Sequence, residues 1–468
     1  MTQSAEGPSA ATPTGARHDV GVDEMFFSTT DAKGVIEQAN SVFVRMSRHP
    51  RQELVGAPHN IIRHPAMPGG AFKLMWDTLA AGLPFCAYVD NLAADGSTYG
   101  VFATITPLGD GYLSVRSRPF QGALHDAAFS LYAQVRPEEL RLREEGATAH
   151  DAAVAGASRL GELLAAAGFP SYEEFVWTAL PAEVESRLAS SAGIPERPEA
   201  TGQLAGMLDA ARGIDVELRR WASGLDDLQS VASRLLLAAP QLRETMQRNQ
   251  ETAELIRDGE VGERFASAGV YLRVWADMAP EVGALVGNLL DQLGELRRSC
   301  AETRFRIALA VLHNTTVGQF VVELADGLPG AEEARPAIGD LCQALEEGMA
   351  LTRQRADLNV SLAASAADQI ASIRDLLELP QSMIRQWLAK ADRAAAPFAQ
   401  VADAVSAQVE RTQADMDLLT ELADQCRRIA VPLDVTRVDA LVAVLADLAG
   451  PKAPGGGRRY LSSTDGSS

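Results

Sequence analysis

Histidine and cysteine are the residues of this chain most capable of chemistry, and neither type is arranged as a ligand cluster. The four cysteines lie far apart, with no C-x-x-C pair, so neither a zinc site nor a disulfide framework is expected. His59 and His64 are five residues apart in a proline-flanked loop, a spacing that is not specific for a metal. We expect reduced, buried thiols at the four positions, which are Cys86, Cys300, Cys342 and Cys426.

No catalytic motif occurs in the sequence. It contains no G-x-x-x-x-G-K-[ST] loop, no G-x-G-x-x-G, no H-E-x-x-H and no kinase signature. His313 has the residue type of a phosphoryl acceptor, but the chain carries no recognisable ATP-binding domain to supply the phosphate. The sequence therefore predicts a protein that is not an enzyme.

Composition limits where such a chain acts and what it binds. It has 468 residues, 47% hydrophobic and 22% charged, and a formal net charge of −20. Residues 20–120 hold eight Lys and Arg against nine Asp and Glu, so nearly all the acidity falls after residue 120 and argues against nucleic acid as a partner. No stretch is long and apolar enough to predict a membrane span, and the first 17 residues do not resemble a secretory signal. We expect a cytoplasmic protein without membrane insertion.

The elements that would position any site are clearest in residues 20–120. Strands are predicted at 25–30, 35–38, 85–92, 98–107 and 112–117, joined by Asp-Gly turns in the last two hairpins. Short helices are predicted at 40–47 and 51–55, and a longer one at 70–81 with Gly82 as its stop. The fold class expected is α+β, a five-stranded antiparallel sheet with short helices, followed by a mostly α-helical region.

Alternation along the last three strands predicts two faces of the sheet. Small and branched side chains on one face leave volume for a ligand, and aromatic side chains on the other need covering; ordinary core packing explains both equally well. The first face is expected to carry Ala87, Val89, Val101, Ala103, Ile105, Leu113 and Val115. The second is expected to carry Tyr88, Phe102 and Tyr112.

This N-terminal segment resembles a PAS domain, and within that group the flavin-binding domain of bacterial aerotaxis receptors. The resemblance is carried by ELVG at 53–56, PHNIIRHPAMP at 58–68, AFKLMW at 71–76 and SVRSR at 114–118. It covers about 100 of the 468 residues. The loop at 58–68 is its most specific part.

The resemblance implies that the domain holds FAD non-covalently and that the redox state of FAD reports oxygen or electron transport. The matching cofactor-pocket positions are Asn40, Arg63, His64, Trp76 and Phe85. Two positions depart from the family pattern, since Ala66 replaces an Asp and Phe85 replaces a Trp. Haem bound through one of the loop histidines, another ligand or an empty pocket therefore remain alternatives to FAD.

The remainder of the chain predicts long helices, divided as 121–280 and 281–449, with disordered tails at 1–19 and 450–468. Two seams alternate steps of four and three residues, as in coiled coils, and such helices pair either between two copies in a homodimer or within one chain. The first seam is Leu296, Cys300, Thr303, Ile307, Ala310, Asn314, Val317, Val321 and Leu324. The second is Phe398, Ala402, Val405, Val409, Thr412, Met416, Leu419, Ala423 and Cys426.

Together these patterns predict a signal-transduction protein. A PAS-bound flavin would sense redox state or oxygen, and helices beginning near residues 118–122 would relay the change to a downstream partner that the sequence does not name. The alternative of a different class is a cofactor-free scaffold that dimerises or docks a partner through the aromatic face of the sheet.

Overall fold

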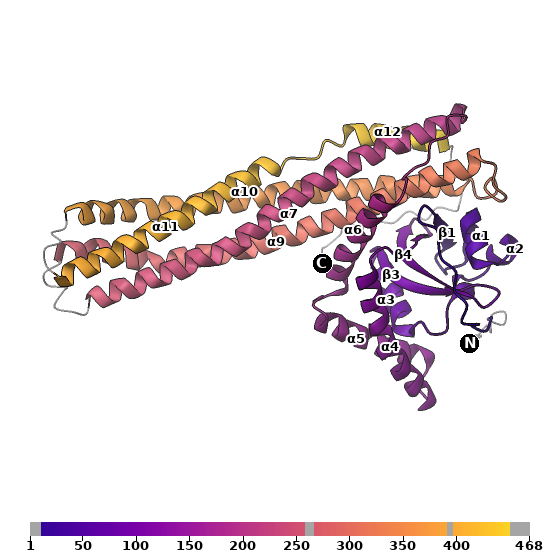
Figure 1. Cartoon of the computed structure of the whole chain (residues 1–468), viewed down its shortest axis with the longest axis horizontal. Helices are drawn as coiled ribbons and strands as arrows, with labels where there is room; N and C mark the ends of the chain where they lie inside the picture. The colour runs from indigo at the N-terminus through magenta and orange to yellow at the C-terminus, as the bar shows by residue number, and fades with distance from the viewer. Residues whose placement is uncertain (1–10, 258–265, 391–395, 450–468) are drawn as a thin grey trace, which may run out of the picture. The chain divides into compact units, whose positions relative to one another are not determined.

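The computed structural model describes residues 11–257, 266–390 and 396–449. The chain divides into two compact units: the first comprises Met1–Arg219, Phe305–Ala350 and Val435–Ser468, and the second Arg220–Arg304 and Leu351–Asp434. The division does not fall at residue 280, because three long helices each contribute residues to both units. These helices are α7 (Gly202–Arg257), α9 (Ala266–Ala325) and α10 (Ala337–Lys390) (Figure 1).

The first unit contains the five-stranded antiparallel sheet that the sequence predicts. Its strand order is β2-β1-β5-β4-β3, so the first and last strands of the chain segment lie side by side in the centre. Gly34, after the turn residue Asp31, has φ 79°, a left-handed conformation that favours glycine. The strands are β1 (Met25–Asp31), β2 (Ile36–Ala39), β3 (Phe85–Leu92), β4 (Thr98–Leu108) and β5 (Gly111–Ser117).

Short helices between β2 and β3 cover one face of this sheet, which we call the inner face. The rings of Phe26 from β1 and Phe43 from the first helix stack at 5.5 Å, and both are fully buried. Burying such side chains is the main source of stability for a domain of this size. The helical segments are α1 (Ser41–Ser47), α2 (Arg51–Leu54), η1 (His59–Ile62) and α3 (Gly69–Ala80).

The register of β5 corrects the predicted faces of the sheet. Residues directly opposite each other in neighbouring strands share a face, and Ala103 lies between Ala87 on β3 and Arg116 on β5. The inner face of β5 therefore carries Tyr112, Ser114 and Arg116, and the prediction that Leu113 and Val115 lie there is wrong. Hydrophobicity predicted the wrong face for the side chains of β5 because the outer face of the sheet is also buried. Apolar side chains therefore occur on both faces.

The outer face is covered by helices of the same chain. Phe102 is 2% exposed, and the Tyr88 hydroxyl donates a 2.8 Å hydrogen bond to Glu183 of α6 (Tyr172–Ser190). In addition, Phe320 of α9 packs edge-on against Phe27 of β1, with 5.0 Å between ring centroids. The aromatic surface that a docking scaffold would use is therefore already filled from within the chain.

Two further helices pack on α3. They are α4 (Gly122–Glu144) and α5 (Ala149–Ala166). A β-carbon added to Gly70 of α3 would lie 2.3 Å from the backbone of Gly156 in α5, so the two backbones approach too closely for any side chain there. The α4–α5 pair is thus seated directly on a helix that covers the inner face.

The segment at residues 14–18 is paired with the hairpin of β3 and β4, which corrects the expectation of a disordered tail over 1–19. The Thr14 amide donates to the Gly96 carbonyl at 2.9 Å, and the Thr98 amide donates to the Ala16 carbonyl at 2.8 Å. These bonds satisfy backbone groups that would otherwise be left open at the hairpin. Residues 1–10 and the predicted tail at 450–468 lie outside the described residues.

The second unit is built from parts of α7, α9 and α10 together with α11 (Ala396–Ile429). Polar contacts join neighbouring helices, such as the 3.0 Å hydrogen bond from Asn359 to Thr303 and the 2.7 Å bond from Thr245 to Asp415. All nine residues of the first predicted seam are buried, and so are those of the second from Ala402 onward; the Phe398 side chain lies outside the described residues. Both stripes are thus buried within one chain.

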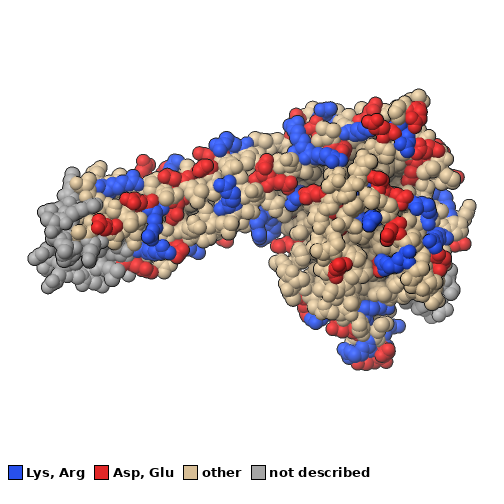
Figure 2. Space-filling model, in the orientation of Figure 1, with Lys and Arg blue, Asp and Glu red and all other residues tan. Residues whose placement is uncertain are grey.

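The rest of the first unit includes α12 (Thr436–Ala449), where Arg437 pairs with Glu217 of α7 at 3.0 Å. Among the described residues, one helical segment, Pro280–Ala325, is apolar and long enough to cross a membrane. Its most apolar window is 94% buried inside the structure, and a core helix passes the same test. On the face drawn in Figure 2, basic and acidic side chains are intermixed over most of the surface.

Candidate functional site

A cavity lies between the inner face of the sheet and the α3 helix. The space reachable by the centres of water molecules is about 250 Å³, far more than one water requires. Its walls come from the loop at 58–68, from α3, from Tyr132 of α4 and from β3, β4 and β5. Lining residues from the sheet include Phe85, Ala87, Val89, Asn91, Ala103, Ile105, Tyr112, Ser114 and Arg116.

Arg116 places a buried positive charge at the cavity. The residue is 5% exposed; its guanidinium donates to His59 Nε2 at 2.8 Å and to Ser28 Oγ at 3.4 Å, and no carboxylate of the described residues pairs with it. Burial lowers the pKa of Arg116 to about 10. Burial also holds the pKa of His59 well below its usual value, with the Arg116 charge acting in the same direction, so His59 is neutral and accepts at Nε2. A charge with only neutral partners favours a ligand that accepts hydrogen bonds or carries negative charge.

Asn91 adds an unmet hydrogen-bond donor to the same cavity. Its side chain is 4% exposed, and Nδ2 has no hydrogen-bond partner in the described part of the chain. An unsatisfied buried donor costs about 1–3 kcal/mol, a cost that a ligand acceptor would remove. Together, Asn91 and Arg116 give the cavity more donors than the protein itself can satisfy.

The aromatic and cationic residues predicted from the loop and α3 stand at the other side of the cavity. The Trp76 ring is 40% exposed and meets Tyr112 edge-on at 5.6 Å. The Arg63 guanidinium lies 4.0 Å from the centroid of the Phe72 ring and makes no hydrogen bond or ion pair with any described residue. Burial lowers the pKa of Arg63, and the nearby Arg136 lowers it further. Phe85 lies 4% exposed in the wall, stacked at 5.2 Å on Tyr172.

The structure brings three of the five predicted site residues together and leaves two outside. Arg63, Trp76 and Phe85 line the cavity, whereas Asn40 and His64 do not. His64 Nδ1 accepts the amide of Ala66, a bond within its own loop. The part of each residue in holding a cofactor stays a prediction.

Asn40 is fully occupied elsewhere. Its Oδ1 accepts the amides of Phe27 and Phe43, and its Nδ2 donates to the Met25 carbonyl and, at 2.7 Å, to Glu323 of α9. This uses the donors and lone pairs of the amide group. Asn40 therefore ties the start of α1 to β1 and to α9.

The carboxylate of Glu139 joins the start of α3, a helix that forms part of the cavity wall, to α4. Glu139 of α4, which is 2% exposed, accepts the amides of Gly69 and Gly70 at 2.7 Å each. These amides begin α3, where a negative charge stabilises the positive end of the helix dipole. The start of α3 is thus hydrogen-bonded directly to α4.

Sequence patterns missed Asn91, Arg116 and Tyr132 as cavity residues. Arg116 lies within the SVRSR string that carried the resemblance, and alternation with Ser114 could have marked it as inward-facing. Asn91 and Tyr132 give no such signal, because whether a donor finds a partner depends on residues distant in the sequence.

Comparison with known proteins supports the domain assignment. No protein-family model matches the chain. The aerotaxis receptor of Escherichia coli (strain K12) is 43% identical over 101 residues, which is 20% of this chain and 20% of that protein. The match therefore spans about a fifth of the curated relative.

Solved structures with similar folds have low sequence identity. The blue-light photoreceptor Aureochrome1 LOV is 18% identical, covering 22% of this chain and 88% of that one, with a TM-score of 0.21. The Rhodobacter sphaeroides LOV protein is 15% identical, covering 31% and 89%, with a TM-score of 0.20.

A sheet of order β2-β1-β5-β4-β3 with short helices and α3 inserted between β2 and β3 is a PAS domain. The 43% match over 101 residues supports a PAS domain of the aerotaxis-receptor type.

Proposed function

We propose that this chain is a cytoplasmic signal-transduction protein whose PAS domain binds a flavin, FAD by its resemblance, and reports redox state or oxygen to a partner protein. The observation that carries the proposal is the excess of donors at the cavity, Arg116 and Asn91. A flavin ring suits such a cavity because it is flat and largely apolar, with carbonyl oxygens and ring nitrogens that accept hydrogen bonds.

Different residues of the chain suit different parts of the flavin. The Arg63 guanidinium lies over the Phe72 ring and makes no hydrogen bond to a described residue, so it suits phosphate oxygens. Trp76 and Phe85 offer aromatic surface for packing. When bound, the flavin supplies reversible uptake of one or two electrons. Arg116, a cation in a low-dielectric site, favours an anionic ligand over a neutral one.

Two routes lead from the cavity to the helices. On the sheet, Arg116 lies opposite Phe26 of β1, and the next residue, Phe27, packs on Phe320 of α9. On the helical side, α3 begins at the carboxylate of Glu139 in α4. A ligand shifts the populations of two helix arrangements only by the ratio of its affinities for them, and each tenfold ratio corresponds to about 1.4 kcal/mol.

The junction expected near residues 118–122 is held by α6. The amides of Phe120 and Gln121 donate to Glu183 at 2.7 and 2.9 Å. Glu183 also accepts from Tyr88 on the outer face of the sheet, so sheet and junction share one carboxylate. We propose that the signal passes through this contact and through α9.

The test is the absorption spectrum of the purified full chain, followed by identification of any released cofactor. We expect flavin bands and release of FAD. A Soret band would favour haem instead, and a colourless chain that takes up neither FAD nor FMN from solution would contradict the proposal.

The predicted homodimer stays a prediction. Both seams are buried within one chain from residue 296 to 324 and from 402 to 426, so a dimer would use other surfaces. The mass of the full chain in solution, measured by light scattering, tests this directly.

A further inference from the structure

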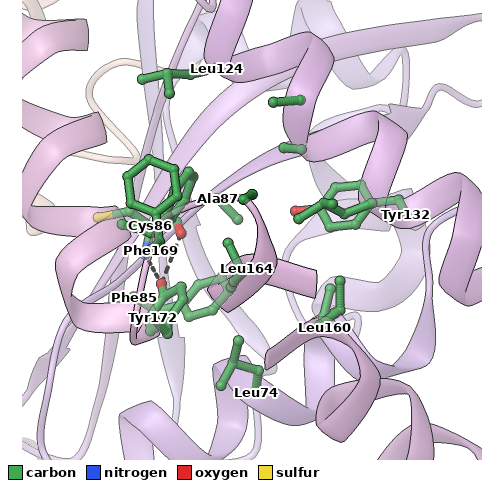
Figure 3. Close-up of a pocket in the computed structure, with 16 residues that line it drawn as sticks. Leu74, Phe85, Cys86, Ala87, Leu124, Tyr132, Leu160, Leu164, Phe169 and Tyr172 are labelled. Carbon is green, nitrogen blue, oxygen red and sulfur yellow. Dashed lines mark hydrogen bonds between the residues drawn. The ribbon is translucent and has the colours of Figure 1, made fainter. Parts of the chain in front are cut away.

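A second cavity lies beside the first, between the β3 edge of the sheet and helices α3, α4, α5 and α6 (Figure 3). Its lining is almost entirely carbon, from aliphatic side chains such as Leu160 and Leu164 and aromatic ones such as Phe169. The Tyr172 hydroxyl in this lining is already satisfied, because it bonds both the amide and the carbonyl of Cys86 at 2.8 Å (Figure 3). The cavity thus offers almost no polar partner to a guest.

The volume and the apolar lining of the second cavity determine which class of molecule it can bind. The space reachable by the centres of water molecules is about 60 Å³, whereas a dry apolar cavity that takes benzene measures about 150 Å³. Water is disfavoured because it needs two to four polar partners, and the lining side chains offer only the Cys86 thiol and the hydroxyls of Tyr132 and Tyr172. A small uncharged molecule such as a diatomic gas fits this volume and this lining.

The two cavities share a wall. Ala71, Phe85, Ala87 and Tyr132 line both. Two of these are alanines, whose side chains are single methyl groups. A small guest in the second cavity would lie next to whatever occupies the first.

We propose that the second cavity is a binding site for dioxygen that feeds the flavin site, an inference that rests on the proposed function. Dihydroflavin in the first cavity would pass two electrons and two protons to dioxygen, giving oxidised flavin and hydrogen peroxide. The apolar annex raises the local concentration of the oxidant at the shared wall, so that the sensor responds to dissolved oxygen.

Xenon is the probe for the site itself, since it occupies apolar cavities and needs no cofactor. The full chain is examined by xenon NMR, or in crystals under xenon pressure, as purified, as Ala128→Leu and as Ala133→Leu. Ala128 of α4 lines only the second cavity and is buried, whereas Ala133 of the same helix is exposed. We expect xenon binding in the unaltered chain and in Ala133→Leu, and its loss in Ala128→Leu.

Oxygen delivery is measured separately, as the rate at which anaerobically reduced protein is reoxidised by dissolved oxygen. We expect Ala128→Leu to slow this rate several-fold with the oxidised flavin spectrum unchanged, and Ala133→Leu to leave it unaltered. If overpacking prevents Ala128→Leu from folding, Leu164→Phe fills the same cavity from α5.

The possible outcomes test the gas site, the delivery of oxygen and the flavin proposal separately. Absence of xenon from the unaltered chain would overturn the gas site. Xenon binding with equal reoxidation rates in all variants would overturn delivery. A colourless chain that still binds xenon would contradict the flavin proposal, and delivery with it, while supporting the gas site.

Discussion

Both faces of the PAS sheet are buried, but polar groups at the cavity of the inner face lack the kind of partner that Tyr88 and Thr106 find on the outer face. On the outer face, the Tyr88 hydroxyl meets Glu183, and Thr106 lies 3.3 Å from His313. On the inner face, Arg116 has no carboxylate partner and Asn91 Nδ2 has no partner at all among the described residues. The satisfied groups hold the sheet to its own helices, and Arg116 and Asn91 mark where the cavity can take a ligand. Thr29 Oγ1 and the Tyr99 hydroxyl also lack a partner among the described residues, but neither residue lines the cavity.

Arg116→Met probes the inner face and should have the largest effect. Hydrogen bonds to a charged group contribute about 1.5–3 kcal/mol, so flavin affinity should fall about 10- to 100-fold. The unfolding free energy of the cofactor-free chain should not fall, because a buried unpaired charge is removed. Equilibrium binding and urea unfolding measure the two quantities. Arg118→Met is the control, since Arg118 is exposed on the same strand end; unchanged flavin affinity in Arg116→Met would abolish the distinction between the faces.

His313 tests the outer face through pH. Burial lowers its pKa to about 4 from an ordinary 6.5, so the unfolded chain binds a proton that the folded chain does not between those values. The unfolding free energy should therefore fall by about 3 kcal/mol as the pH drops from about 6.5 to 4, and be fully present above that window. His313→Gln should flatten this part of the pH profile, whereas His150→Gln, at an exposed position, should not. Parallel profiles for His313→Gln and the unaltered chain would contradict the prediction.

Glu183→Gln should lower the free energy of unfolding without changing the affinity for flavin. The carboxylate accepts three hydrogen bonds, and an amide would turn its NH₂ toward at least one of the donors. We expect a loss of about 2 kcal/mol in urea unfolding with flavin affinity unchanged. Glu173→Gln, exposed on the same helix, is the matched control. A parallel loss of flavin in Glu183→Gln would show that the outer face also holds the ligand.

The smallest difference concerns two neighbours in the loop. Arg63 lines the cavity and His64 does not, so Arg63→Ala should weaken flavin binding by about 1–2 kcal/mol more than His64→Ala. Titration of each cofactor-free variant with FAD gives this difference. Equal losses would mean that the ligand extends beyond the cavity to His64.

Much of the domain was predictable because its signals are local. The helix predicted at 70–81 is observed at Gly69–Ala80, and the five strands agree within one or two residues. Turn residues, alternation and helix stops act over a few positions, so they can be recognised without knowing the fold. The two seams were recognisable for the same reason.

The candidate site was predictable only in part. Arg63 from the loop, Trp76 from α3 and Phe85 from β3 all line the cavity. Asn40 and His64 were predicted with them, but their side chains make hydrogen bonds away from the cavity. A motif identifies residue types, and only neighbours determine what their polar atoms contact.

Local patterns in the chain were sufficient to determine the order of its strands and helices, the two buried seams and the class of its N-terminal domain. The faces of β5, the unmet donors Arg116 and Asn91 and the cavity beside them depend on contacts between residues far apart in sequence. Strand register illustrates the reason: a shift of one residue reverses every side chain on β5. With both faces of the sheet buried, hydrophobicity cannot tell one register from the other, and the packing of α3 and α9 does.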